Sequence, residues 1–70
     1  MKYIVIELQT NKDGSVGNIV SVYDTQEQAE SKYHAILASA AVSQVPVHAA
    51  SLLTSEGYTL DSKCYTHGGE

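Results

Sequence analysis

Residues 24–42, DTQEQAESKYHAILASAAV, decide the fold, because they contain the best-marked element of the chain. Asp24 or Thr25 can serve as the helix N-cap, since a Glu or Gln follows three residues after each, which is the capping-box spacing. One apolar stripe then recurs at helical spacing, made of Ala29, Tyr33, Ile36, Leu37 and Ala40. We therefore expect a helix at about residues 25–42 whose stripe packs on a sheet.

The segments on either side of this helix alternate with a period of two and are rich in β-branched residues, which predicts two hairpins. Turn residues at 11–15 and 55–57 separate the strands, and Pro46 bars continuation of the helix. Residues 66–70 are expected to form a frayed tail. The four strands are predicted at about 2–10, 18–23, 45–54 and 58–65.

The order of elements predicts a single domain over residues 1–70 with an α+β fold. A ββαββ chain with short connections gives a wholly antiparallel four-stranded sheet in the order 2-1-3-4. One helix covers one face of this sheet, so the expected architecture is a two-layer sandwich.

Both faces of the predicted sheet are apolar, and a single helix can cover only one of them. Side chains such as Val5, Val20, Val22 and Leu52 cannot all lie beneath the helix along with Ile4, Ile6, Leu8 and Leu53. The uncovered face favours a homo-oligomer. A second candidate interface is the seam of small residues on the back of the helix, at Ser31, Ala35, Ala38 and Val42.

Charge and composition exclude several classes of partner. The chain has eight acidic residues, four Lys and no Arg, for a net charge of −4, which argues against direct binding to nucleic acid. No apolar run approaches the roughly 20 residues that a membrane-spanning helix needs, so we expect no membrane partner. Cys64 is the only cysteine, which rules out a disulfide within the chain.

Cys64, His48 and His67 are the residues that could carry metal or nucleophile chemistry. A second hairpin centred on Glu56 would place His48 opposite Cys64. A closed zinc site needs four ligands, and a thiol nucleophile needs a group that orients the His and donors for an oxyanion. We therefore expect no metal, no cofactor and no enzymatic activity. If a ligand pocket exists, its candidate residues combine aromatic faces with hydrogen-bond donors: Tyr33, His34, His48, Lys63 and Tyr65.

Three segments, GNIV at 17–20, QAESKYHAIL at 28–37 and SEGY at 55–58, resemble short uncharacterised proteins of tailed bacteriophages and prophages of Gram-positive gut bacteria. This resemblance implies a viral product that acts in the bacterial host cytoplasm or is carried in the virion. The leading expectation is a non-catalytic accessory protein that sequesters a small host metabolite or a host defence protein, with a ligand enclosed between subunits. The alternative is a structural or assembly accessory of the virion.

Overall fold

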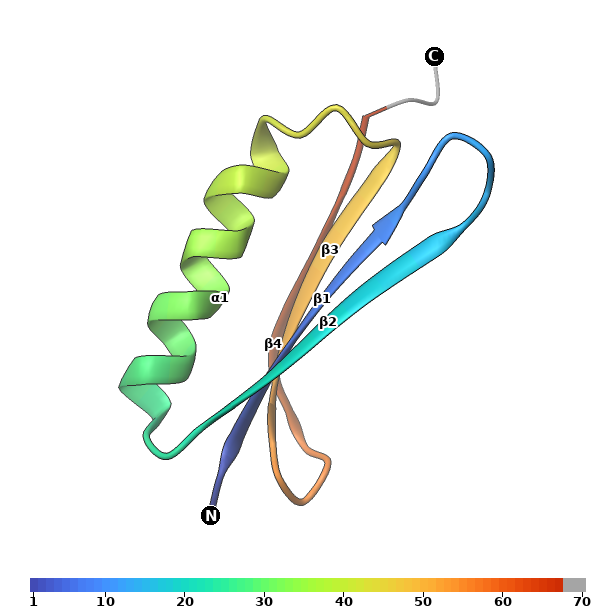
Figure 1. The fold of residues 1–70 in the computed structure, drawn as a ribbon. Helices are drawn as coiled ribbons and strands as arrows, with labels where there is room; N and C mark the ends of the chain where they lie inside the picture. The colour runs from blue at the N-terminus through green and yellow to red at the C-terminus, as the bar shows by residue number, and fades with distance from the viewer. Residues whose placement is uncertain (68–70) are drawn as a thin grey trace.

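A computed structural model describes residues 1–67 as a four-stranded antiparallel sheet with one helix along one side (Figure 1). The strand order is β2-β1-β3-β4, so the predicted α+β class and topology are confirmed. The elements are β1 (Tyr3–Thr10), β2 (Val16–Tyr23), α1 (Gln26–Ala41), β3 (Val47–Thr54) and β4 (Thr59–Thr66).

The element boundaries differ from the predictions by one or two residues. Strand β2 begins earlier, because Val16 and Gly17 still pair with the end of β1. Strand β3 begins only after Pro46, which has no backbone N–H to donate to a ladder. Thr66 belongs to β4 rather than to a frayed tail, and residues 68–70 of the predicted tail lie outside the described residues.

Of the two possible caps, Thr25 is the N-cap of α1. Its backbone is extended and its side chain accepts a hydrogen bond of 3.2 Å from the backbone N–H of Gln28. Asp24 instead forms an exposed ion pair with Lys2, which ties the start of the helix to the beginning of β1. The first turn of α1 also carries Glu27, whose charge suits the positive end of the helix dipole.

The core lies between α1 and the sheet, and it is small. The predicted stripe faces the strands: four of its residues are buried and Leu37 is partly buried. Opposite them lie Val5 from β1 and two residues of β3. The buried cluster consists of Val5, Ala29, Tyr33, Ile36, Ala50 and Leu52, with Tyr3, Tyr23 and Leu37 at its margin.

The open face of the sheet is the side that points away from α1. Strand pairing and alternation place the following residues there: Ile4, Ile6, Leu8, Thr10, Val16, Asn18, Val20, Val22, Val47, Ala49, Ser51, Leu53, Thr59, Ser62, Cys64 and Thr66. No described helix or strand covers this side (Figure 1). The helix thus covers Val5 and Leu52, whereas Val20 and Val22 remain with Ile4 and Ile6 on the open face.

Candidate functional site

Three polar side chains meet beneath the helix, on the face of the sheet that otherwise forms the core. Glu7 and Gln9 are two residues apart on β1 and share this face, and His48 on β3 pairs with Gln9. The Nε2 atom of His48 lies 2.6 Å from Oε2 of Glu7, and the Gln9 amide donates to the same oxygen at 3.1 Å. Both hydrogen bonds end on Oε2, so Oε1 of Glu7 receives neither of them.

The Glu7–His48 pair is well shielded from solvent. The side chains of His48 and Glu7 are only 5% and 13% exposed. Burial opposes ionisation of Glu7, but the hydrogen bonds from His48 and Gln9, together with the positive charges of His48 and Lys32, hold its pKa below the ordinary value of 4.5. Glu7 is therefore ionised at neutral pH. Among the described residues, Nδ1 of His48 is a buried nitrogen without a hydrogen-bond partner.

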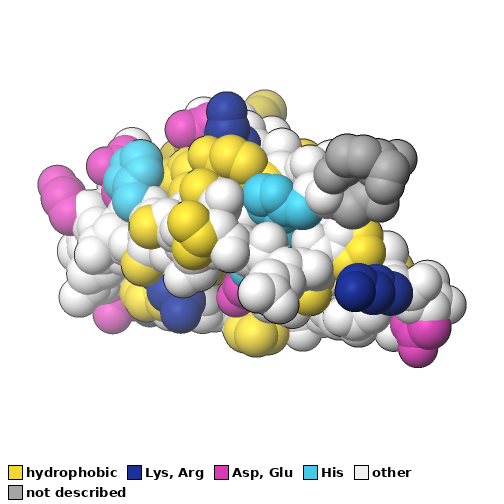
Figure 2. Space-filling model, turned by 90° about the horizontal axis from the view of Figure 1, so that it is seen from above, with side chains coloured by type: hydrophobic (Ala, Val, Ile, Leu, Met, Phe, Trp, Pro, Cys, Tyr) yellow, Lys and Arg dark blue, Asp and Glu magenta, His cyan; other side chains and the backbone are white. Residues whose placement is uncertain are grey.

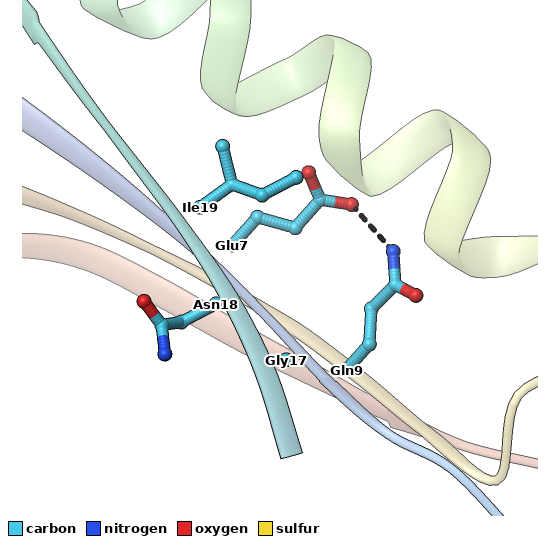
Figure 3. Close-up of a pocket in the computed structure, with 5 residues that line it drawn as sticks. All are labelled: Glu7, Gln9, Gly17, Asn18 and Ile19. Atoms are coloured by element: carbon cyan, nitrogen blue, oxygen red, sulfur yellow. Dashed lines mark hydrogen bonds between the residues drawn. The ribbon is translucent and has the colours of Figure 1, made fainter. Parts of the chain in front are cut away.

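A cavity of about 160 Å³ adjoins this cluster, lined by Glu7, Gln9, Gly17, Asn18 and Ile19. Figure 3 shows the side chains of Glu7, Gln9 and Ile19 directed toward α1, whereas the side chain of Asn18 points away from it. Gly17 pairs with Gln9 and leaves open space where a Cβ would stand, with no atom within 4 Å. The missing side chain at Gly17 helps to keep the cavity open.

The arrangement is suited to binding N–H groups rather than to activating a nucleophile. Nε2 of His48 faces a carboxylate and an amide, whereas a nucleophile site would place a hydroxyl or thiol against this nitrogen. An ionised carboxylate and a neutral amide side by side accept hydrogen bonds strongly and disfavour anions.

The five ligand residues expected from the sequence do not form one site. Tyr33 is buried in the core, where burial and the nearby Asp61 carboxylate raise the pKa of its hydroxyl. His34 is exposed, with its ring edge-on to Tyr33 at 5.5 Å. His48, Lys63 and Tyr65 do share the helix side of the sheet: Tyr65 pairs with His48, and the Lys63 ammonium lies 5.3 Å from the Tyr65 ring.

The predicted opposition of His48 and Cys64 is wrong. Leu53 pairs with Thr59, as a turn centred on Glu56 requires, but an irregularity between Leu52 and Leu53 leaves Leu60 as an extra residue. Every pair beyond this bulge is displaced by one. Cys64 consequently pairs with Ala49 on the open face, away from His48.

His67 also lies apart from Cys64. Its Nε2 atom is 2.6 Å from the carbonyl oxygen of Ala40 at the end of α1, and its ring stacks on Tyr65. Within residues 1–67, no group of three His, Cys, Asp or Glu side chains is placed to hold a metal ion.

Two surfaces remain as candidates for self-association. The four residues of the helix seam, Ser31, Ala35, Ala38 and Val42, are all exposed on the outer side of α1. On the open face, Val16, Val20 and Val22 of the edge strand β2 are 57–60% exposed. Hydrophobic atoms also reach the surface between histidine and charged side chains in the view from above in Figure 2.

Glu7, Gln9 and Gly17 were missed as candidate site residues. A signal for the first two was present: they continue the alternation that includes the apolar Tyr3 and Val5, so a polar pair falls on a core face. Gly17 carried no such signal, because a glycine beside a turn is ordinary. The place of Gly17 in the cavity lining depends on the β1–β2 register, which pairs it with Gln9.

In the part of the chain that the structure describes, α1 is too short and too polar to cross a bilayer. No protein family, no curated protein and no solved structure was found that matches this chain.

Proposed function

We propose that this chain is a non-catalytic bacteriophage accessory protein, which works as a homo-oligomer and sequesters a small signalling ligand or a host protein to counter bacterial defence. The observation that carries ligand capture is the buried Glu7–His48 pair beside a cavity. A buried carboxylate costs desolvation, and a cavity forgoes packing contacts. Such an arrangement serves recognition better than stability. The phage setting rests on the resemblance carried by residues 17–20, 28–37 and 55–58.

The cavity lining supports a ligand that presents N–H donors. Glu7 is ionised and Gln9 offers an amide oxygen, so an amine, an amide or the edge of a nucleobase would find acceptors there. A phosphate group would be repelled by the Glu7 carboxylate. The volume of about 160 Å³ is below the roughly 300–1,000 Å³ of pockets that enclose a whole drug-sized ligand. It therefore suits one group of the ligand, with the remainder outside.

Ligand capture can be tested with the small-molecule fraction of extracts from phage-infected bacteria. The purified protein is incubated with this fraction and washed, and retained compounds are identified by mass spectrometry. Gly17→Val adds a side chain beside the cavity, at a position where a Cβ meets no atom within 4 Å, and is expected to abolish retention. Glu7→Gln keeps the shape but removes the charge, and is expected to weaken it at least about tenfold.

The matched control is Ser39→Val, which adds a similar side chain on the exposed surface of α1, away from the cavity and from the open face of the sheet, and should retain the ligand normally. Equal retention by the wild type and Gly17→Val would contradict capture at this cavity. Stoichiometric presence of the protein in purified virions would contradict the defence role and favour the virion role.

A further inference from the structure

The open face of the sheet is an apolar surface large enough for a stable interface. Four strands of eight residues cover an area of about 19 by 26 Å, or about 500 Å² of flat footprint. Two such faces in contact would bury at least about 1,000 Å² in total, which is the size that a specific interface needs. The accessible surface area of the face is larger than this flat footprint, because side chains project from the sheet.

The chemistry of this face identifies its partner. Of its 16 described residues none carries a charge, and the polar ones are only Thr, Ser, Asn and Cys. The chain as a whole has a net charge of −4. A basic partner would be drawn to the acidic surface elsewhere, whereas an uncharged face lets two copies approach with their charges held apart. Salt screens charges separated by more than about 8 Å.

The shape of the molecule allows two copies to pack in this way. Its extents are 40, 20 and 15 Å, so the helix and sheet form a thin slab with one bare side. Two twisted antiparallel sheets pack face to face at about 10 Å, with their strands within about 30° of each other. A two-fold axis through the contact makes the same residues meet on both sides. The resulting dimer has four layers, with the helices outside.

We propose that the open face binds the open face of a second copy of this chain, forming a symmetric dimer. The inference rests on the homo-oligomer of the proposed function and names its interface. The interface lies on the opposite side of the sheet from the Glu7–His48 cavity, so each dimer leaves both cavities accessible. The proposal places self-association on the open face of the sheet rather than on the seam on the back of α1.

Two Val→Lys variants separate these surfaces. Val20 is 57% exposed on the open face, and Val42 is 80% exposed at the end of the helix seam. Wild type is expected to scatter light as a species of twice 7.5 kDa at micromolar concentration. Val20→Lys should raise the dissociation constant at least about a hundredfold, since the symmetric dimer carries the change twice. Val42→Lys should leave the constant unchanged.

Val20→Thr is a milder variant that controls for misfolding. It preserves the branched shape of the side chain and its preference for β-strands. It should raise the dissociation constant about tenfold with unchanged circular dichroism. A wild-type protein that stays at 7.5 kDa at all concentrations would overturn the proposal and leave the face to another partner. Loss of the dimer in Val42→Lys alone would also overturn it.

Cys64 supplies an independent readout, because its exposed thiol lies on the open face, on the edge strand opposite β2. Face-to-face packing should slow its alkylation by a small thiol reagent at least about tenfold as the protein dimerises. Unchanged alkylation in a dimer would indicate pairing through another surface, such as the β2 edge or the helix seam, and contradict the proposal.

The ligand assay uses the other side of the sheet, so the two proposals fail separately. If the wild type is a monomer that binds the ligand, and Gly17→Val abolishes this binding, only the dimer is contradicted. If the wild type is a dimer that retains no ligand, only ligand capture at the cavity is contradicted.

Discussion

Glu7 and His48 are 41 residues apart in the chain, yet their side chains meet 2.6 Å apart beneath α1. They are diagonal neighbours across the β1–β3 ladder, since Glu7 pairs with Ala50 and His48 pairs with Gln9. The contact therefore exists only when the two central strands are in register. It joins the two halves of the chain at a polar cluster next to the apolar core.

The first prediction concerns pH. Because the pKa of folded Glu7 is below its ordinary value of 4.5, the folded state binds this proton more weakly than the unfolded chain does. The resulting stability is present above the unfolded pKa and is lost as pH falls through the folded pKa. Between about pH 5 and pH 3, wild type should lose more free energy of unfolding than Glu7→Gln.

Urea unfolding at several pH values measures this difference. The pKa values of Asp13 and Asp24 are also lowered, by hydrogen bonds from Ser15 and Lys2 respectively, but both residues are present in both proteins and their effects cancel. Parallel curves for the two proteins would show that Glu7 is not stabilised by its partners.

The second prediction concerns the size of the core. Leu52 is buried against α1, so Leu52→Ala should reduce the free energy of unfolding by about 2–5 kcal/mol. A domain of this size has about 5 kcal/mol or less, so the variant should be largely unfolded at 37 °C by circular dichroism. Leu60→Ala is the matched control, since Leu60 is 45% exposed, and it should remain folded. Equal losses would contradict the assignment of the core face.

A third prediction distinguishes the two possible N-caps. Thr25→Ala removes the side-chain acceptor for the backbone N–H of Gln28 and should cost about 1 kcal/mol of stability. Asp24→Ala removes only an exposed ion pair with Lys2 and should have the smaller effect. Thermal unfolding of both variants at low and high salt is the measurement. A larger loss for Asp24→Ala would mean that the helix begins one residue earlier.

A fourth prediction contrasts two glycines. Gly57 has a φ of 95° in the β3–β4 turn, a conformation that a side chain disfavours, so Gly57→Ala should destabilise the protein by about 1–2 kcal/mol. Gly17 lies in a strand without a positive φ and with free space beside it, so Gly17→Ala should be neutral or stabilising by up to about 1 kcal/mol. Gly57→Ala should therefore lower the denaturant midpoint, whereas Gly17→Ala should leave it unchanged or raise it. A loss of stability in Gly17→Ala would indicate strain in β2.

The local features of the fold were predictable because their causes are local. The helix stripe from Ala29 to Ala40 is a periodicity within one segment, and the turn residues near Gly14 and Gly57 mark reversals of a few residues. The strand order followed from short connections between successive elements. That one sheet face would remain uncovered also followed, since the chain encodes a single helix.

The tertiary structure decided which residues meet across strands. A single bulge at Leu60 displaces every β3–β4 pair from Leu52 to Val47 by one residue, and no local signal in the sequence marked it. Side chains alternate between faces, so this displacement alone sets Tyr65 rather than Cys64 beside His48. The Glu7–His48 contact likewise depends on the pairing of β1 with β3 across the helical connection. Sequence periodicity determines the face on which a residue lies, but long-range register determines its neighbour, because register is set by the packing of the whole sheet.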